Sequence, residues 1–332
     1  MYLTNNPLAR HDWPLWPTYG LEDDILPTLQ AWAATHRHAA LATLVHISGS
    51  SPRPLGSEMA IAPDGAVIGY VSGGCVESTV AAEAQSVLET GEPKMLDYGA
   101  GSPVLDVQLT CGGRIGILVT RIDDLHDWVA TRQAARTERR ELFFDIDLAT
   151  GHRTCHEASE TALPAGTFRQ HYPPPARLML VGGDPVTLAI CELAGTLGLE
   201  VGLIRAYGPT TPPPGRPLNY YDNRPLTQAL PDMPLDAWSA VYSLTHDLDD
   251  DQTVLEQGLR SPAFRVGVLG SRRKADERLA KLRAIGFDEA DIERLNMPAG
   301  LPIHAANPRE IALSVLAEIT ARRPRPAPRV GA

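Results

Sequence analysis

The spacing of apolar residues in the first half of the chain predicts a mixture of helices and short strands. Apolar positions recur every three or four residues, as in amphipathic helices, over 23–37, 76–90 and 123–136. Short apolar runs predict strands at 39–47, 57–62, 66–71, 104–109, 114–120 and 142–148. The turn residues Pro63, Asp64 and Gly65 between two of these runs predict a β-hairpin. This half is therefore expected to be a mixed α+β domain.

The second half alternates strands and helices regularly. Strands are predicted at 177–181, 201–204, 238–244 and 265–269, and helices at 185–197, 250–259, 274–285 and 308–322. Asp184 is placed to cap the first of these helices, and Gly198 to end it. Such alternation predicts a doubly wound parallel sheet, which binds ligands at the carboxyl ends of its strands. The fold class is therefore α/β, with a Rossmann-like C-terminal domain.

Proline-rich segments set the expected domain boundaries. We predict an irregular N-terminal arm at 1–22, an α+β domain at 23–172, a proline-rich linker at 173–176, a Rossmann-like domain at 177–322 and a disordered tail at 323–332. The segment 151–176 has no clear period.

Composition narrows the class of protein. A chain of 332 residues with 43% hydrophobic content is long enough for two domains. A formal charge of −10 argues against a nucleic-acid partner, which needs a basic face. Four cysteines make a poor disulfide framework in a chain of this length, and its start lacks the order of a signal peptide. No apolar run approaches the ~20 residues of a membrane span, so a cytoplasmic protein without a membrane segment is expected.

The segment VSGGCVES places Cys75 behind Gly73 and Gly74 at the start of a predicted helix. The positive end of the helix dipole and the unpaired N–H groups of its first turn favour a thiolate. Glu77 would oppose the thiolate if its side chain faced the sulfur. Cys75 is therefore either a reactive or metal-binding thiol or a small core residue.

A second cysteine has a similar setting in the segment LTCGG. Gly112 and Gly113 follow Cys111 and allow a sharp bend whose backbone N–H groups can hold an anion. A tight bend between strands is the alternative. Cys75 and Cys111 are not in a C-x-x-C arrangement, so the sequence predicts no local zinc or redox motif, although the fold can bring the two thiols together.

Two other segments of the first half contain polar side chains of interest. The turn GSSPRP follows a predicted strand and offers the Ser50 hydroxyl and the Arg53 guanidinium, which suits a phosphate or carboxylate. A solvated turn arginine is the alternative. The segment HRTCH, at 152–156, lacks a fourth metal ligand at standard spacing and is interpreted as a polar hairpin.

The first turn of the second half does not match a dinucleotide-binding fingerprint. Counted from Gly182, the motif G-x-G-x-x-G would need glycine where the chain has Asp184 and Thr187. The next strand ends at Arg205, where an NAD-binding fold carries an acid. A carboxylate at the helix entry would also repel a pyrophosphate. NAD is therefore not expected as a cofactor.

A more favourable anion site is the segment GSRRK, which opens a helix directly after a strand. Basic residues are unfavourable at a helix N-terminus unless they meet an anion, so Ser271, Arg272 and Arg273 are predicted to bind one. His246 follows another strand at the expected ligand edge and can donate a proton or a hydrogen bond. The alternative is that its segment, 245–247, only caps the next helix.

Taken in order, these motifs resemble the XdhC/CoxI family. GSSPRPLGSEM, DGAVIGYVSGGCVES and LTCGG are similar to its N-terminal domain, and RLMLVGGDPVTLA, LTHDLDDD, VGVLGSRRKADERLAKLRAIGF and PREIALSVLAEI to its Rossmann-like C-terminal domain. The resemblance extends from about Leu41 to Thr320. It departs at Asp184, where the family commonly has glycine, and at Arg205, where aspartate is usual.

The resemblance implies a maturation factor for molybdenum hydroxylases such as xanthine dehydrogenase, rather than an enzyme. Such a factor binds molybdenum cofactor, as molybdopterin or its cytosine dinucleotide form, and protects it. It supports sulfuration of the cofactor by a cysteine desulfurase and inserts it into the large subunit of the hydroxylase apoenzyme. Cys75 and Cys111 would then contact the molybdenum, and a homodimer is expected.

The residues alone leave two other functions open. One is an NAD(P)-dependent oxidoreductase that uses the Rossmann-like half. The other is a thiol redox regulator built on Cys75 and Cys111.

Overall fold

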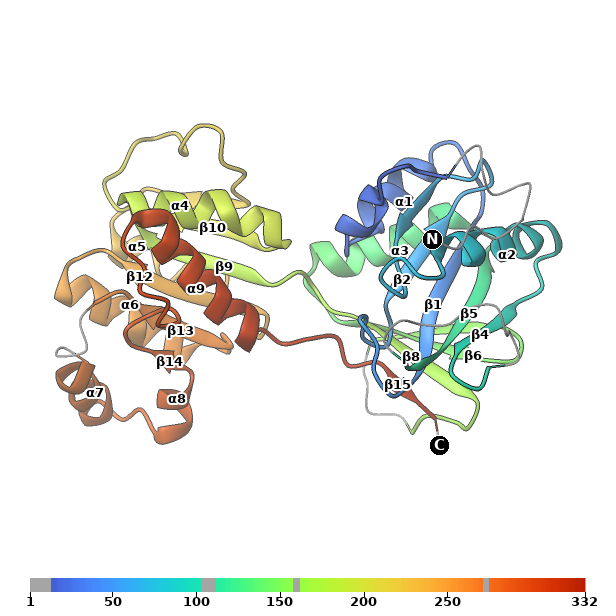
Figure 1. The fold of residues 1–332 in the computed structure, drawn as a ribbon. Coiled ribbons are helices and arrows are strands. Elements are labelled where there is room, and N and C mark those ends of the chain that lie inside the picture. Colours follow the sequence, from blue (N-terminus) through green and yellow to red (C-terminus); the bar gives the residue numbers. More distant parts are fainter. Residues whose placement is uncertain (1–12, 103–111, 158–161, 271–274, 332) are drawn as a thin grey trace. The chain divides into compact units, whose positions relative to one another are not determined.

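The structure, a computed structural model, describes residues 13–102, 112–157, 162–270 and 275–331. The chain divides into two compact units, which Figure 1 shows with their elements labelled. The N-terminal unit comprises Met1–Pro174 and Pro326–Ala332, and the C-terminal unit comprises Pro175–Arg325. The division falls between Pro174 and Pro175, inside the proline-rich segment predicted to be the linker.

A five-stranded antiparallel sheet is the centre of the N-terminal unit, with strand order β3-β2-β1-β5-β4. Its strands are β1 (Ala39–Ser48), β2 (Glu58–Ile61), β3 (Val67–Gly69), β4 (Lys94–Gly99) and β5 (Arg114–Ile122). β2 and β3 pair antiparallel, which confirms the predicted hairpin. The sequence pattern does not predict β4, because this edge strand begins with exposed Lys94 and Met95 and buries only Leu96 and Tyr98. The predicted strand 104–109 lies outside the described residues.

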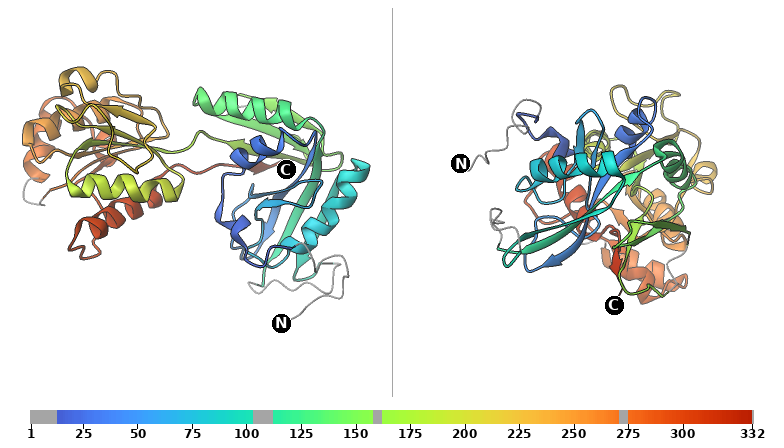
Figure 2. Two further views of the ribbon diagram at one scale, coloured as in Figure 1. Left: turned by 90° about the horizontal axis from the view of Figure 1, so that it is seen from above. Right: turned by 90° about the vertical axis from the view of Figure 1, so that its right-hand side faces the viewer.

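Three helices cover this sheet on its two faces: α1 (Leu26–Trp32), α2 (Glu77–Thr90) and α3 (Leu125–Thr137). Successive residues of a strand point to opposite faces, so β1 contributes to two cores. Leu41 and Val45 pack in the core formed with α1 and α3. Ala42 and Leu44 pack in the core formed with α2, which Figures 1 and 2 show on the opposite face. This double burial explains why β1 is a continuous apolar run in the sequence.

A smaller four-stranded sheet completes the N-terminal unit, with order β15-β8-β6-β7. Its strands are β6 (Leu142–Asp147), β7 (Arg153–His156), β8 (Thr167–Tyr172) and β15 (Arg329–Val330). The expectation of a disordered tail at 323–332 is wrong for Arg329 and Val330, which pair antiparallel with β8. Pairing at a sheet edge uses backbone hydrogen bonds, so the polar composition of the tail did not reveal it.

The segment before β1 also packs on this unit. It contains a short 3-10 helix, η1 (Thr18–Leu21), and the rings of Trp13 and Tyr19 meet edge to face with centroids 5.3 Å apart. Tyr19 is buried. The end of the arm closest to the domain is therefore part of the packed structure.

The C-terminal unit is built on six parallel strands in the order β11-β10-β9-β12-β13-β14. They are β9 (Arg177–Gly182), β10 (Glu200–Ile204), β11 (Tyr220–Asp222), β12 (Ser239–Leu244), β13 (Arg265–Val268) and β14 (Leu295–Asn296). Counted from β9, this is the 3-2-1-4-5-6 order of dinucleotide-binding folds, which confirms the predicted Rossmann-like domain. β10 and β11 lie on one side of β9, and β12, β13 and β14 lie on the other, so the strand order reverses between β9 and β12. Ligands bind at this switch point in such folds.

Helices lie on both faces of the parallel sheet. α4 (Pro185–Ala194), continued by the 3-10 helix η2 (Gly195–Leu197), packs with α9 (Pro308–Arg322) on one face. α5 (Leu226–Ala229), α6 (Leu248–Arg260) and α7 (Ala275–Ala284) contribute to the core on the other face, and α8 (Glu289–Glu293) follows α7. Figures 1 and 2 show α4 and α9 side by side. Within the described ranges, no helix is both long enough and apolar enough to cross a bilayer.

Candidate functional site

Three glycine-containing turns meet at one end of the five-stranded sheet. They are residues 49–53 after β1, 72–75 after β3 and 112–113 before β5. Gly113 packs so closely that a Cβ there would lie 2.1 Å from the carbonyl oxygen of Ser50. A Cβ on Gly73 would lie 3.2 Å from the Pro52 ring. The first turn therefore contacts both of the others, and no residue larger than glycine fits at position 113 without a shift of backbone.

The thiol of Cys75 lies at this end of the sheet and is exposed. Cys111, the other predicted thiol, lies outside the described residues, so its distance from Cys75 stays a prediction. Gly74 and Gly112 are exposed, and a Cβ on either one would have no other atom within 4 Å. The backbone of both turns is therefore open to the approach of a flat ligand.

The Glu77 carboxylate fills the hollow formed by the backbone of the second turn. Five backbone N–H groups donate to its two oxygens at 2.8 to 3.2 Å, those of Val71, Ser72, Gly73, Gly74 and Val76. The Ser72 hydroxyl lies 2.8 Å from Oε2. The Glu77 side chain is only 1% exposed. Successive N–H groups of this kind form an anion-binding concavity, and the anion here belongs to the chain itself.

This arrangement changes the interpretation of the SGGC turn. The N–H groups of Cys75 and Val76, just before α2, were expected to be unpaired and close to the thiol. They are instead hydrogen-bonded: that of Cys75 donates to the Ser72 hydroxyl at 3.1 Å, and that of Val76 donates to Glu77. The N–H groups of the turn are therefore satisfied without a ligand. The sequence contains the signal in Glu77, since an acid that directly follows a glycine-rich turn can accept from the successive N–H groups of that turn.

Arg53 is held by other residues of the N-terminal unit. Its Nη2 lies 2.7 Å from Oδ1 of Asp23, and its guanidinium stacks 4.2 Å from the centroid of the Tyr70 ring. The side chain is 16% exposed. Ser50 is exposed at the same end of the sheet. Arg53 thus fixes the first turn to the start of the domain, and its predicted contact with a ligand stays a prediction.

A histidine and an aspartate meet at the switch point of the C-terminal unit. His246 follows β12, Asp184 follows β9, and His246 Nε2 lies 2.9 Å from Asp184 Oδ2. The backbone of His246 is left-handed, with φ of 63°, which is uncommon for a residue with a side chain. Asp247 caps α6, as the alternative interpretation of this segment proposed, and leaves the His246 ring to contact Asp184.

Asp184 also caps α4, as the sequence predicts. Its Oδ1 accepts hydrogen bonds from the N–H and hydroxyl of Thr187, at 2.7 and 2.6 Å. Burial raises the pKa of the Asp184 carboxyl, but the hydrogen bonds from Thr187 and His246 outweigh it and hold this pKa below its usual range. A carboxylate therefore occupies the helix entry where a dinucleotide would place its pyrophosphate.

The segment 271–274, which contains Ser271, Arg272 and Arg273, lies outside the described residues. The helix that follows it, α7, is anchored by a buried ion pair between Arg278 and Asp251, with Nη2 2.6 Å from Oδ2. The other oxygen of Asp251 accepts from the hydroxyls of Ser243 and Thr245. This network ties the start of α7 to the carboxyl end of β12. The sequence alone does not indicate this network, because Asp251 is one of several acids in the run LDDDQ.

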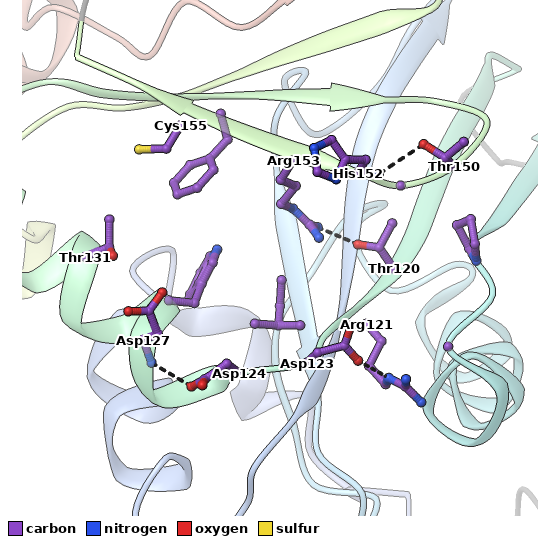
Figure 3. Close-up of a pocket in the computed structure, with 16 residues that line it drawn as sticks. Thr120, Arg121, Asp123, Asp124, Asp127, Thr131, Thr150, His152, Arg153 and Cys155 are labelled. Carbon is purple, nitrogen blue, oxygen red and sulfur yellow. Dashed lines mark hydrogen bonds and ion pairs between the residues drawn. The ribbon is translucent and has the colours of Figure 1, made fainter.

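A cavity of about 460 Å³ lies elsewhere in the N-terminal unit, between α3 and the β6–β7 hairpin. Figure 3 shows Arg153 and Cys155 on one side of it and Asp124 and Asp127 on the other. Arg153 donates to the Thr120 hydroxyl, and Asp124 caps α3. None of the described residues that the sequence predicted to bind a ligand lines this cavity.

The interpretation of residues 152–156 as a polar hairpin is confirmed. β7 pairs antiparallel with β6, and His156 lies 3.2 Å from Asp145. In the part of the chain that the structure describes, no group of three or more His, Cys, Asp and Glu side chains could hold a metal ion. Cys191 is buried in the core of the C-terminal unit, as predicted.

Comparison with known proteins gives the family. Residues 178–319 match the profile of the XdhC Rossmann domain, and residues 32–99 match that of the XdhC and CoxI family. The chain is 30% identical over 286 residues to the molybdenum cofactor insertion chaperone PaoD of Escherichia coli strain K12, an alignment that covers 86% of this chain and 83% of that protein.

Two further relatives agree with this match over nearly the whole chain. A probable xanthine dehydrogenase subunit of Bacillus subtilis strain 168 is 26% identical over 333 residues, which cover 90% of this chain and 97% of that protein. The crystal structure of a xanthine dehydrogenase from Bacillus halodurans superposes with a TM-score of 0.73 at 23% identity, covering 89% of this chain and 94% of that one, and so has the same fold. The chain belongs to the XdhC/CoxI family.

Proposed function

We propose that this protein is a molybdenum cofactor-binding chaperone. It protects the cofactor, supports its sulfuration and inserts it into a molybdenum hydroxylase of the xanthine dehydrogenase type. The observation that carries this proposal is the 30% identity, over most of both chains, to a molybdenum cofactor insertion chaperone. The similarity to a probable xanthine dehydrogenase subunit supports the class of partner enzyme.

The chemistry of the N-terminal unit suits such a cargo. Molybdenum in a dithiolene is a soft centre, for which a cysteine sulfur is a suitable contact, and Cys75 presents an exposed thiol. Gly73, Gly74 and Gly112 provide exposed backbone without side chains, against which a flat pterin can lie, and buried Gly113 lets their turns pack together. We assign the contact with the metal to Cys75 and Cys111 and the contact with the pterin to these glycines and Ser50.

The phosphate of the cofactor needs cationic or N–H-rich surroundings. We assign it to the basic segment with Ser271, Arg272 and Arg273 and to the loop with His246, both of which follow strands of the parallel sheet. Arg53 acts in this proposal by holding the turn that carries Ser50. The cargo is molybdopterin or its cytosine dinucleotide form.

The partners follow from the same proposal. A cysteine desulfurase supplies the sulfur that replaces an oxo ligand of the molybdenum, and the large subunit of the hydroxylase receives the finished cofactor. We propose that the protein works in the cytoplasm as a homodimer.

Reconstitution of a cofactor-free hydroxylase tests the proposal. The wild-type protein, loaded by co-expression with the molybdenum cofactor pathway, should restore hydroxylase activity. Cys75→Ser should keep its fold but restore little activity, whereas Cys155→Ser, which removes another exposed thiol, should behave as the wild type. Full activity with a Cys75→Ser, Cys111→Ser double variant would remove the thiols from the proposal.

A further inference from the structure

The loop after β10 holds an arginine side chain in a narrow space. The stem of Arg205 lies between Gly183, in the loop after β9, and Gly208, three residues further along its own loop. A Cβ on Gly183 would lie 2.5 Å from Arg205 Nε, and a Cβ on Gly208 would lie 2.7 Å from Arg205 Cγ. Side chains at positions 183 and 208 would therefore displace the guanidinium from its present place.

The acids nearest to this arginine in the chain and the sheet have other partners. Asp184 is hydrogen-bonded to His246, as described above. The backbone carbonyl of Asp222 accepts from the N–H of Arg205 at 2.9 Å, yet the Asp222 carboxylate pairs with Arg224 at 2.6 Å. Among the residues that the structure describes, none accepts a hydrogen bond from the Arg205 guanidinium, and the residue is exposed. The loop therefore presents a fixed cation without an internal counter-ion.

An aromatic ring lies two residues further along the same loop. Tyr207 is 84% exposed, and its backbone is left-handed with φ of 57°. This conformation is fixed by a hydrogen bond of 3.0 Å from the Tyr207 N–H to the carbonyl of Asn223. An exposed aromatic ring is suited to stacking on a flat heterocycle, and this ring belongs to the same loop as the arginine.

The place of this loop in the fold indicates the ligand chemistry. The end of the second strand is where dinucleotide-binding folds recognise the ribose, with an acid for a hydroxyl or an arginine for a phosphate. A guanidinium binds a phosphate through two parallel hydrogen bonds. The pyrophosphate position at the start of α4 is taken by Asp184, so the ligand is not an ordinary dinucleotide lying along that turn.

We propose that Arg205 binds the phosphomonoester of a small ligand whose flat heterocyclic ring contacts Tyr207. Such a phosphomonoester can come from a pterin phosphate or from a nucleotide with a ribose phosphate. Identifying the ligand as molybdenum cofactor rests on the proposed function, and it would move the phosphate of the cofactor from the segment with Arg272 and Arg273 to Arg205. The phosphate preference of Arg205 does not rest on the proposed function.

Two pairs of probes test the site on the purified full-length protein. Isothermal titration at low ionic strength compares 6-hydroxymethylpterin monophosphate with 6-hydroxymethylpterin, and adenosine 2′-monophosphate with adenosine. In at least one pair the phosphorylated compound should bind about ten-fold more tightly than its alcohol, as one good charge-assisted contact provides. A preference within the pterin pair identifies a pterin phosphate, and a preference within the adenosine pair identifies a ribose phosphate.

The variants decide whether Arg205 is responsible. Arg205→Ala should abolish the preference for phosphate, Arg205→Lys should keep part of it, and Gly183→Ala should weaken it by displacing the guanidinium. Arg260→Ala, which removes an exposed arginine of α6, is the matched control and should change nothing. The proposal is overturned if neither phosphorylated compound binds better than its alcohol, or if the preference survives in Arg205→Ala and is lost only in Arg272→Ala with Arg273→Ala. Neither outcome bears on the cofactor content of the purified protein, which tests the proposed function separately.

Discussion

The Glu77 carboxylate lies 2.8 Å from the backbone nitrogen of Ser72 and is enclosed by the turn that carries Cys75. An acid placed two residues after the cysteine, rather than a ligand, is what satisfies the N–H groups of this turn. The shape of the turn is therefore set before any cargo arrives, and Cys75 is presented on a rigid support.

Replacing Glu77 with alanine should destabilise the N-terminal unit strongly. Several buried N–H groups would lose their acceptor together, and each unpaired group costs about 1 to 3 kcal/mol, so we expect the free energy of unfolding to fall by at least about 3 kcal/mol. Glu89→Ala, at an exposed position of the same helix, should cost less than about 0.5 kcal/mol. Urea denaturation measures both. A loss below about 1 kcal/mol in Glu77→Ala would show that the carboxylate does not support the turn.

The cysteines should differ sharply in their reaction with iodoacetamide. Cys75 is exposed, whereas Cys191 is fully buried and burial raises the pKa of its thiol to about 11. Since only the thiolate reacts, Cys75 should be alkylated at least about 100-fold faster than Cys191 at pH 7 in the native protein. Mass spectrometry of timed samples resolves the sites. Equal rates in the native state, before any unfolding, would contradict the described environment of Cys191.

The contact between Asp184 and its partners should make stability depend on pH. The folded state lowers the pKa of Asp184, so this carboxylate contributes stability above its unfolded pKa of about 3.9 and loses it as the pH falls through the lower folded value. Asparagine caps a helix about as well as aspartate, so Asp184→Asn removes only the charge. Wild type should therefore exceed Asp184→Asn in stability by at most about 1 kcal/mol at pH 7, with a difference that shrinks below about pH 4. Urea denaturation across this range measures it, with Asp249→Asn as the exposed control. If the stability difference between wild type and Asp184→Asn grew as the pH falls, the charged carboxylate would not be the stabilising form.

The basic segment before α7 is predicted from its sequence to bind an anion. Arg272→Ala with Arg273→Ala should weaken the binding of sulfate or cofactor by about ten-fold or more, because two charge-assisted contacts are lost. Lys281→Ala with Arg283→Ala removes the same number of charges from the other end of the helix and should have little effect. Equilibrium dialysis with labelled sulfate compares the two double variants. If both bind sulfate alike, the segment has no special role.

Much of the fold could be predicted from the sequence, where packing leaves a pattern. β9, β10 and β12 are buried on both faces and stand out as apolar runs, and Asp184 marks the start of α4. β11, β14 and β15 could not be predicted, because they are two or three residues long and lie at sheet edges, where backbone hydrogen bonds rather than apolar side chains place them.

The candidate site was predictable only in part, because contacts between distant segments depend on strand order. The glycines around Cys75 indicated a special turn, but the role of Glu77 appears only once the turn folds over its carboxylate. His246 and Asp184 meet because β9 and β12 are neighbours at the switch point, which the sequence pattern does not specify. The sequence shows Arg205 in place of the acid that an NAD-binding fold carries there. Only the structure shows that its side chain lies between two glycines.

The cofactor content of the protein tests the central claim most directly. The full-length chain is co-expressed with the molybdenum cofactor synthesis pathway and purified, and molybdenum is measured by mass spectrometry and pterin by the fluorescence of its oxidised form. The account predicts molybdenum and pterin in equal amounts approaching one per binding-competent chain, and a strong loss of both in a Cys75→Ser, Cys111→Ser variant that remains folded. Wild-type protein purified without molybdenum or pterin, under conditions in which a co-expressed hydroxylase acquires both, would contradict it.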